Sequence, residues 1–282
     1  MDIKTLLAHC TLALAESGSP SPRLDCELLL MRLLAIDRVH FLSHPEQEIP
    51  EEQGAAFERL VVRRKSGEPV SYIIGEKEFW SLRFAVTPAV LIPRPETECL
   101  IEEALCFYPP PGEGLTICDI GTGSGIIAIV LAKELPLARI VATDISAEAL
   151  SVARKNASLH GVSGRVEFRQ ADVFAETVGE FDMICSNPPY IADDGYALLP
   201  EGIRNFEPRG ALAAGTDGLD MYRKIIREAT DRLKKGGRIF FEIGEGQRNP
   251  VIELLHDAGG YTDIRCRSDY GGMDRVLSAQ KV

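Results

Sequence analysis

The feature that most constrains the fold is a regular alternation of short apolar segments and longer helical segments over residues 115–279. The apolar segments have the length and composition of buried strands, and the segments between them repeat apolar residues at helical spacing. The expected strands are 115–120, 139–144, 166–170, 181–186, 237–243, 261–267 and 275–279, and the expected helices are 126–135, 147–160, 220–233 and 251–256. This alternation predicts an α/β fold with a doubly wound, mostly parallel sheet.

The first part of the chain, residues 1–75, has helical periodicity instead. Apolar residues recur at helical spacing near its start, and the Ser-Pro pair at 21–22 marks the beginning of a further helix. We therefore expect a small all-helical N-terminal domain over 1–75. Residues 76–95 are expected to form a β-hairpin linker turned at Thr87-Pro88, and residues 96–282 to form the larger α/β domain.

Both parts of the chain are acidic, which argues against a nucleic-acid partner. The formal net charge is −11; residues 1–75 hold 8 Lys and Arg against 11 Asp and Glu, and the remainder holds 23 against 31. Nucleic-acid binding domains usually carry a basic bias. No apolar run has the length of a membrane span, and the first residues lack a signal-peptide layout. We therefore expect a cytoplasmic monomer that binds neither a membrane nor nucleic acid directly.

The cysteines and histidines give no sign of a metal site. None of the seven cysteines belongs to a CxxC pair, and the five histidines do not have metalloprotease-type spacing. We expect reduced, mostly buried thiols and no bound metal.

A glycine-rich segment follows the first expected strand. Its residues are Gly121, Thr122, Gly123, Ser124 and Gly125. Glycines let the backbone turn sharply and approach a ligand that side chains would block. The last glycine comes one residue too early for the dinucleotide fingerprint, and no Lys-Ser or Lys-Thr pair follows, which excludes a P-loop. The segment is therefore expected to bind a ligand of another class.

Two aspartates are expected on the same rim as the glycine segment. Asp144 ends the second strand, where a carboxylate can accept hydrogen bonds from both hydroxyls of a ribose. Asp172 follows the third strand and can accept an adenine amino group, with Val173 and Phe174 beside the ring. Alone, each aspartate is more often a loop or cap residue. Because ligands of doubly wound sheets bind beyond the carboxyl ends of the strands, their shared position favours a nucleoside site.

A stiff corner, Asn187-Pro188-Pro189-Tyr190, follows the fourth expected strand. The residue before a proline is pushed toward an extended conformation, and the prolines fix φ and lack N–H groups. The Asn187 side-chain oxygen and a neighbouring backbone carbonyl can each accept one N–H of a planar NH2 group, while Tyr190 covers a face of it. A plain surface turn is the alternative, but the composition of the corner favours recognition of an amide or an amino group.

Together these motifs resemble those of class I S-adenosylmethionine-dependent methyltransferases, which have a Rossmann-like, seven-stranded, mostly parallel sheet. The resemblance narrows with Phe79, the segment Leu91-Ile92-Pro93-Arg94-Pro95-Glu96-Thr97-Glu98, the ending from Tyr270 to Val276 and the helical N-terminal domain. Over essentially its whole length the chain resembles the PrmC/HemK family of release-factor glutamine methyltransferases.

The resemblance implies an activity, a cofactor and a partner. The activity is methyl transfer from S-adenosylmethionine, giving S-adenosylhomocysteine, to the glutamine N5 of the Gly-Gly-Gln loop of class 1 peptide-chain release factors. It implies that Asn187 and the Pro188 carbonyl hold the glutamine amide while Tyr190 packs on it, with Pro189 and Leu91 also in the substrate site. The cofactor would contact the glycine segment, Asp144, Asp172, Val173 and Asn187, and the helical domain would help to dock the release factor.

Three other functions remain open at this point. A glutamine methyltransferase that acts on a ribosomal protein would carry the same domain. An adenine-N6 nucleic-acid methyltransferase shares the corner, but the acidic composition and the lack of an evident target-recognition domain argue against it. A non-catalytic cofactor-binding adaptor would not require the intact corner.

Overall fold

The computed structural model describes residues 1–112, 114–175 and 179–282. The chain divides into two compact units, one of them formed by Met1–Glu76 with Pro200–Phe206 and the other by Lys77–Leu199 with Glu207–Val282. The division into a docking domain, a linker and a catalytic domain remains a prediction about what these parts do. None of the helices in the described ranges has the length and apolarity that crossing a bilayer requires.

The first unit is all-helical. Its helices are α1 (Ile3–Glu16), α2 (Pro22–Leu34), α3 (Arg38–Ser43), α4 (Glu51–Lys65), α5 (Val70–Ile74) and α10 (Glu201–Phe206). Leu14, Leu30 and Phe57 are among the buried residues of its core. The short helix α10 comes from a distant part of the chain, and a Cβ added to Gly202 would lie 2.9 Å from the backbone oxygen of Gly67. This close backbone approach explains a glycine at position 202.

The second unit contains a sheet with strand order β5-β4-β3-β6-β7-β9-β8. The strands are β3 (Thr116–Ile120), β4 (Arg139–Asp144), β5 (Val166–Gln170), β6 (Phe181–Ser186), β7 (Leu233–Glu242), β8 (Tyr261–Ser268) and β9 (Asp274–Lys281). Strand β9 is antiparallel to both β7 and β8, and the other pairs are parallel. The predicted seven-stranded, mostly parallel sheet is confirmed.

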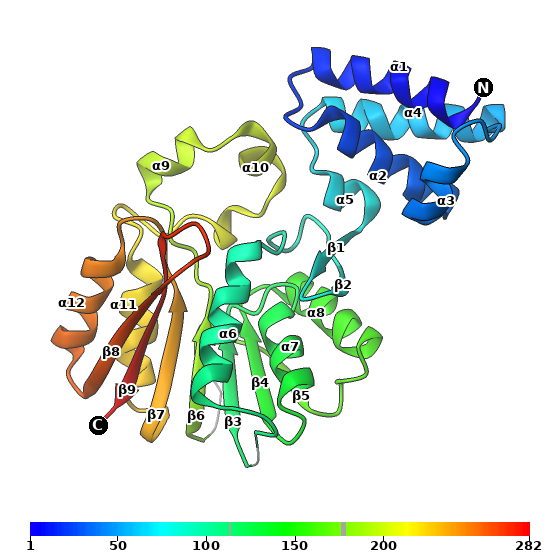
Figure 1. The fold of residues 1–282 in the computed structure, drawn as a ribbon. Helices are drawn as coiled ribbons and strands as arrows, with labels where there is room; N and C mark the ends of the chain where they lie inside the picture. Colours follow the sequence, from blue (N-terminus) through cyan, green and yellow to red (C-terminus); the bar gives the residue numbers. More distant parts are fainter. Residues whose placement is uncertain (113, 176–178) are drawn as a thin grey trace. The chain divides into compact units, whose positions relative to one another are not determined.

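Each face of this sheet packs against its own set of helices (Figure 1). The helices of the unit are α6 (Glu98–Phe107), α7 (Ile126–Glu134), α8 (Ala147–Leu159), α9 (Asp193–Leu198), α11 (Asp220–Ala229) and α12 (Arg248–Ala258), with short 3₁₀ turns at Pro95–Thr97 (η1) and Arg209–Ala211 (η2). Along β3, Ile117 belongs to the core under α6 and α7, whereas Cys118 belongs to the core under α11 and α12. Buried side chains on both faces explain the continuous apolar character of these strands.

The hairpin was predicted with the wrong turn. Strands β1 (Glu76–Phe79) and β2 (Leu82–Ala85) are joined at Trp80 and Ser81, whose φ angles are 54° and 55°. Two positive φ angles are typical of a tight two-residue hairpin turn, but such turns usually have Gly or Asn at these positions instead of Trp and Ser. Trp80 is held by hydrogen bonds from its backbone N to Glu98 and from its indole N to Glu134, both at 2.8 Å. Residues 90–92, predicted as the second strand, are irregular.

The boundary between α11 and β7 also differs from the prediction. The helix ends at Ala229, and β7 begins at Leu233 instead of Gly237. Leu233 pairs with Phe181, and the register then shifts before Met183 pairs with Arg238. Gly236 and Gly237 therefore lie inside β7, at the irregularity that glycines in a strand often mark. The short helices α9 and α10 were not predicted.

Candidate active site

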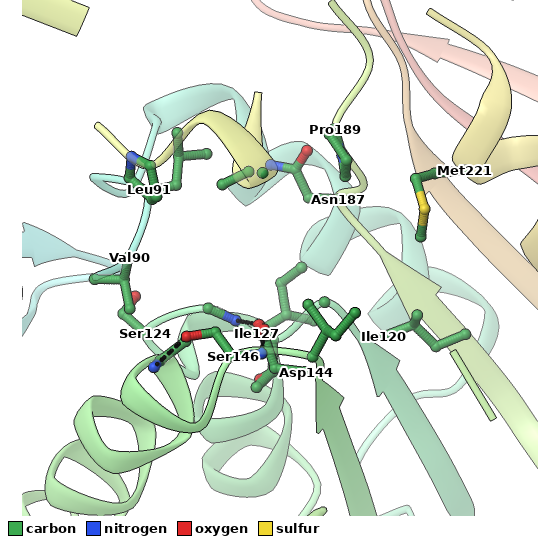
Figure 2. A pocket seen from close by; sticks show the side chains of 18 of the residues that line it. Val90, Leu91, Ile120, Ser124, Ile127, Asp144, Ser146, Asn187, Pro189 and Met221 are labelled. Atoms are coloured by element: carbon green, nitrogen blue, oxygen red, sulfur yellow. Dashed lines mark hydrogen bonds between the residues drawn. The ribbon is translucent and has the colours of Figure 1, made fainter. Parts of the chain in front are cut away.

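The carboxyl ends of the central strands share one edge of the sheet, and the loops that follow them line a large cavity. Its volume is about 490 Å³. The predicted site residues that line it are Leu91, Gly121, Thr122, Gly123, Ser124, Asp144, Asp172, Val173, Asn187 and Pro189. In Figure 2, Asn187 and Leu91 lie above the open space and Asp144 lies below it. The structure therefore brings the glycine segment, both aspartates and the corner to one cavity.

Three predicted site residues do not belong to the cavity lining. Gly125 has a φ of +86°, and a Cβ there would lie 2.9 Å from Ile129 Cδ1, so this glycine permits close packing of α7. Pro188 is buried and is not one of the residues that line the cavity. Tyr190 packs against the core under α11 and α12, and burial raises the pKa of its phenol to about 12. The roles assigned to Pro188 and Tyr190 stay predictions.

The glycine segment and Asp144 are joined through the backbone. Asp144 Oδ2 accepts a hydrogen bond from the Gly123 N–H, and Oδ1 accepts one from the Ser146 N–H, both at 2.9 Å. Gly121 and Gly123 have φ angles of +69° and +55°, and a Cβ on either would meet no atom within 4 Å. Because both residues line the cavity, their missing side chains leave the backbone accessible to a ligand.

A buried aspartate that was not predicted for the site holds the glycine segment from below. Asp119 Oδ2 accepts hydrogen bonds from the Thr122 hydroxyl at 2.6 Å and from the Ala128 N–H at 3.2 Å. Burial raises the pKa of Asp119 to about 7, against the lowering effect of these two bonds. The carboxyl group thus connects β3, the glycine segment and the first turn of α7.

Asp172 is half-exposed and forms an ion pair with Lys224 of α11. The next residue, Val173, is buried and has a φ of +61°, which is rare for a β-branched side chain. Strained backbone of this kind persists where surrounding structure imposes it, and it is concentrated at functional sites. Both residues line the cavity, as predicted, but the Lys224 partner was not predicted.

The Asn187 side chain is held by two buried residues from other segments. Its Nδ2 donates to Thr97 Oγ1 at 3.1 Å, and Thr97 Oγ1 in turn donates to Glu242 Oε2 at 2.6 Å. Thr97 is in η1, and Glu242 ends β7. Because Nδ2 faces Thr97, the side-chain oxygen of Asn187 remains available as an acceptor. This is the atom that the sequence predicted for recognition of an NH2 group.

The Gln247 side chain fixes the far end of the corner. Its Nε2 donates to the carbonyl oxygens of Tyr190 at 2.9 Å and Gly218 at 3.1 Å, and its Oε1 accepts from the Gly244 N–H at 3.0 Å. A Cβ on Gly218 would lie 2.5 Å from the Tyr190 carbonyl oxygen, which explains the glycine there. Gln247 therefore ties the corner to the loops before α11 and after β7.

A buried glutamate holds the segment that contains Leu91. Glu207 accepts hydrogen bonds from the Ile92 N–H at 3.1 Å and from the Arg94 guanidinium at 2.5 Å. Its side chain is almost fully buried. These bonds give the irregular segment 90–94 a defined course beside the cavity.

Asn156 connects the glycine segment to the hairpin. From α8, its Nδ2 donates to the carbonyl oxygens of Ser124 at 2.8 Å and Ala85 at 3.0 Å, and its Oδ1 accepts from the Ala85 N–H at 2.7 Å. Asn156 is fully buried. A polar residue beside Ala153 and Ala157 on the buried face of α8 is a sequence signal for such a role.

The arrangement places an acceptor for an N–H group in the same cavity as a glycine cradle and a carboxylate suited to ribose hydroxyls. The fold and this cavity define the protein as a class I methyltransferase. Residues 5–75 match the family described as PrmC N-terminal domain, and residues 106–205 match the methyltransferase small domain. Relatives that are 40% and 43% identical to it along nearly its whole length show that the chain belongs to the release factor glutamine methyltransferase family.

The family assignment follows from full-length relatives. The release factor glutamine methyltransferase of Rhodopirellula baltica is 40% identical over 288 residues, which cover 99% of this chain and 96% of the relative. The protein of the same name from Cereibacter sphaeroides is 43% identical over 267 residues, which cover 95% of this chain and 94% of the relative. The fold alone is shared with the T. thermophilus 16S rRNA N2 G1207 methyltransferase RsmC, solved with AdoMet and guanosine. That chain is 19% identical, with a TM-score of 0.55 and coverage of 73% of this chain and 50% of the other.

Four of the residues that sequence reasoning missed share one property. Thr97, Glu242, Gln247 and Lys224 lie far from the glycine segment and the corner in sequence and reach the site only through the fold. Glu242 had a readable signal, because it ends an apolar strand in the same way as Asp144. Gln247 and Lys224 had none.

Proposed function

We propose that this protein transfers a methyl group from S-adenosylmethionine to the side-chain amide nitrogen of the glutamine in the Gly-Gly-Gln motif of class 1 peptide-chain release factors. The observation that carries the chemistry is the placement of Asn187 on the cavity that also holds the glycine cradle and Asp144, with its Nδ2 engaged by Thr97 so that its oxygen keeps its acceptor capacity. The relatives that share the chain's full length support the choice of substrate.

The residues of the cavity fit S-adenosylmethionine. A volume of about 490 Å³ lies in the range of small-molecule sites. Gly121 and Gly123 leave space that side chains would fill, and Asp144 retains acceptor capacity beyond its two backbone bonds. Asp172 and Val173 stand on the same lining, where an adenine would be held. When bound, S-adenosylmethionine supplies a methyl group that is already activated by its sulfonium.

The contribution of the chain is to hold and orient the amide that accepts the methyl group. An amide nitrogen is a weak nucleophile, and alignment of reacting groups contributes about 7–11 kcal/mol in favourable cases. We assign Asn187 Oδ1 to one N–H of the glutamine amide and the Pro188 carbonyl to the other, with Tyr190 beside it. As positive charge develops on that nitrogen, its N–H groups become stronger donors, so these acceptors favour the transition state over the ground state.

The test is methyl transfer from labelled S-adenosylmethionine to a purified class 1 release factor, with a release factor whose loop glutamine is replaced by alanine as the control. We expect label on the wild-type release factor alone. Label on both release factors would reject the glutamine assignment. Binding of S-adenosylmethionine without labelling of either would reject the release factor as substrate, and ribosomal protein would be the next substrate to assay.

A further inference from the structure

Asn187 is held by a pair of polar side chains that are almost completely removed from solvent. Thr97 is 0% exposed and Glu242 is 1% exposed. No ion pair to Glu242 is present in the described part of the chain, and the neighbouring Arg275 guanidinium donates to Asp269 and to the Ile243 carbonyl instead. A buried carboxylate without an ion pair opposes stability. Its presence next to the site therefore suggests a task other than stabilising the fold.

We propose that Thr97 and Glu242 are positioning residues that hold the Asn187 amide in one of its two orientations, with Nδ2 donating to Thr97 and Oδ1 left to accept from a substrate. This inference rests on the proposed function, because it assigns that oxygen to the substrate amide. It goes further by naming the groups that make Asn187 an acceptor instead of a donor.

The orientation of the Asn187 amide follows from which of its neighbours can donate a hydrogen bond. An ionised carboxylate can only accept, so Thr97 must donate its single hydroxyl proton to Glu242. The 2.6 Å distance between Thr97 Oγ1 and Glu242 Oε2 is that of a charge-assisted O–H···O bond. The Thr97 oxygen then has only lone pairs left for Asn187 and accepts from Nδ2. A flipped amide would bring its oxygen against those lone pairs, so the relay excludes that orientation.

Protonation of Glu242 would release this constraint. A carboxylic acid can donate to Thr97, which frees the Thr97 proton for Asn187 Oδ1 and permits the flipped amide. The NH2 group would then face the NH2 group of the substrate, donor against donor. We therefore expect turnover to rise with pH as Glu242 loses its proton and to fall as the pH drops below that transition.

The groups around Glu242 place the transition in the neutral range. Burial raises the pKa of Glu242 to about 7; hydrogen bonds from Thr97 and Asn187 and the charge of Arg275 lower it, and the charge of Glu96 raises it. Burial raises the pKa values of Tyr190 and Tyr222, which lie on the corner and on α11, and the charge of Glu242 raises them further. Burial also raises the pKa of Asp119, under the glycine segment, to about 7. Mutation of Glu242 is therefore needed to show which step of a pH profile belongs to Glu242.

The kinetic test compares Thr97→Val, Thr97→Ser and Glu242→Gln at saturating S-adenosylmethionine, with the full chain and purified release factor. We expect kcat to fall about 10- to 100-fold in Glu242→Gln and about 10-fold in Thr97→Val, as for a small misplacement of a reacting group. Thr97→Ser, which keeps the hydroxyl, should restore most of the activity. Glu242→Gln should also remove the Glu242 step from the pH profile of kcat. Thr230→Val is the matched control, because that hydroxyl bonds the Ile226 carbonyl away from the cavity.

Stability separates a positioning role from a structural one. Because Glu242 carries a buried charge without an ion pair, Glu242→Gln should unfold at an equal or higher temperature than wild type while losing turnover. A lower unfolding temperature in step with the loss of activity would overturn the proposal. So would wild-type kcat in both Thr97→Val and Glu242→Gln.

A spectroscopic test does not depend on the substrate. The Asn187 side-chain NH2 signal in a ¹H–¹⁵N spectrum, assigned by its loss in Asn187→Ala, should shift with pH across the neutral range in wild type and stay fixed in Glu242→Gln. The same pH dependence in both proteins would overturn the inference. If wild type shows the expected shift but methylates no release factor, the relay stands and the proposed function fails. If wild type methylates its substrate and Thr97→Val does so equally well, the proposed function stands and the relay fails.

Discussion

The Asp144 side and the Asn187 side of the cavity are held in place by different kinds of contact. Asp144 is fixed by the backbone N–H groups of Gly123 and Ser146, which follow directly from the glycine segment and the start of α8. Asn187 is fixed by the side chains of Thr97 and Glu242, which come from η1 and from the end of β7. One side is built by local backbone geometry and the other by buried side chains from distant segments.

The difference predicts how each side responds to mutation. Backbone donors remain when neighbouring side chains change, so the Asp144 side should be sensitive mainly to loss of its own carboxylate. The Asn187 side should lose function when any of several remote residues is replaced. It should do so without a matching loss of cofactor binding, because we assign those residues to the substrate amide.

The largest effect is expected from Asn187→Ala. It removes the acceptor that we propose for the substrate N–H, and loss of a preorganised group that stabilises a transition state costs about 10²- to 10³-fold in kcat. Calorimetry should show that the dissociation constant of S-adenosylmethionine is largely retained. Asn249→Ala, an exposed site on α12, is the matched control. An equal loss of turnover and cofactor affinity would place Asn187 on the cofactor side instead.

Asp144→Ala tests the opposite side of the cavity. We expect the dissociation constant of S-adenosylmethionine to rise about 10- to 100-fold, because hydrogen bonds to a charged group contribute about 1.5–3 kcal/mol. At saturating cofactor, kcat should recover toward the wild-type value. Titration calorimetry measures the first quantity, with the exposed Asp257→Ala as control. An unchanged dissociation constant would remove Asp144 from the cofactor site.

On both sides of the cavity the sequence predicted the residues expected to meet a ligand, but it did not predict the side chains that hold Asn187. The glycine segment, Asp144 and the corner were identified from their positions after apolar strands, because strand ends of a parallel sheet share one rim. The strands 139–144, 166–170 and 181–186 agree with the structure residue for residue. For such buried strands, local composition and tertiary packing favour the same conformation.

What could not be predicted depends on long-range contacts or on turn residues without a typical signal. The hairpin turn at Trp80 and Ser81 is imposed by Glu98 and Glu134, which hold the Trp80 backbone and indole from two helices. Gln247 reaches the corner because β7 ends beside β6. Neither pairing leaves a periodic pattern in the sequence, since each depends on side chains meeting across the fold.

Gln247→Leu should have a smaller effect on turnover than Asn187→Ala, together with a clear effect on stability. The substitution leaves the carbonyls of Tyr190 and Gly218 and the N–H of Gly244 without a partner. We expect the free energy of unfolding to fall by about 1–3 kcal/mol, and kcat to fall about 10-fold as the corner shifts. Chemical denaturation and steady-state kinetics measure the two changes. Unaltered stability would show that these backbone groups find other partners.

The smallest effect is expected from Lys224→Ala, which tests whether cofactor binding on the Asp144 side depends on a remote side chain. Lys224 and Asp172 form a partly exposed ion pair, and such pairs contribute about 0–1 kcal/mol. In the proposed site the adenine amino group binds the Asp172 carboxylate, for which Lys224 would compete, so removal of Lys224 should lower the dissociation constant of S-adenosylmethionine slightly. Because salt screens an exposed ion pair, added salt should also lower this dissociation constant in wild type, but not in Lys224→Ala. The exposed Lys235→Ala is the control. Weaker binding in Lys224→Ala would mean that the lysine itself contacts the cofactor, and the Asp144 side would then also depend on a remote side chain.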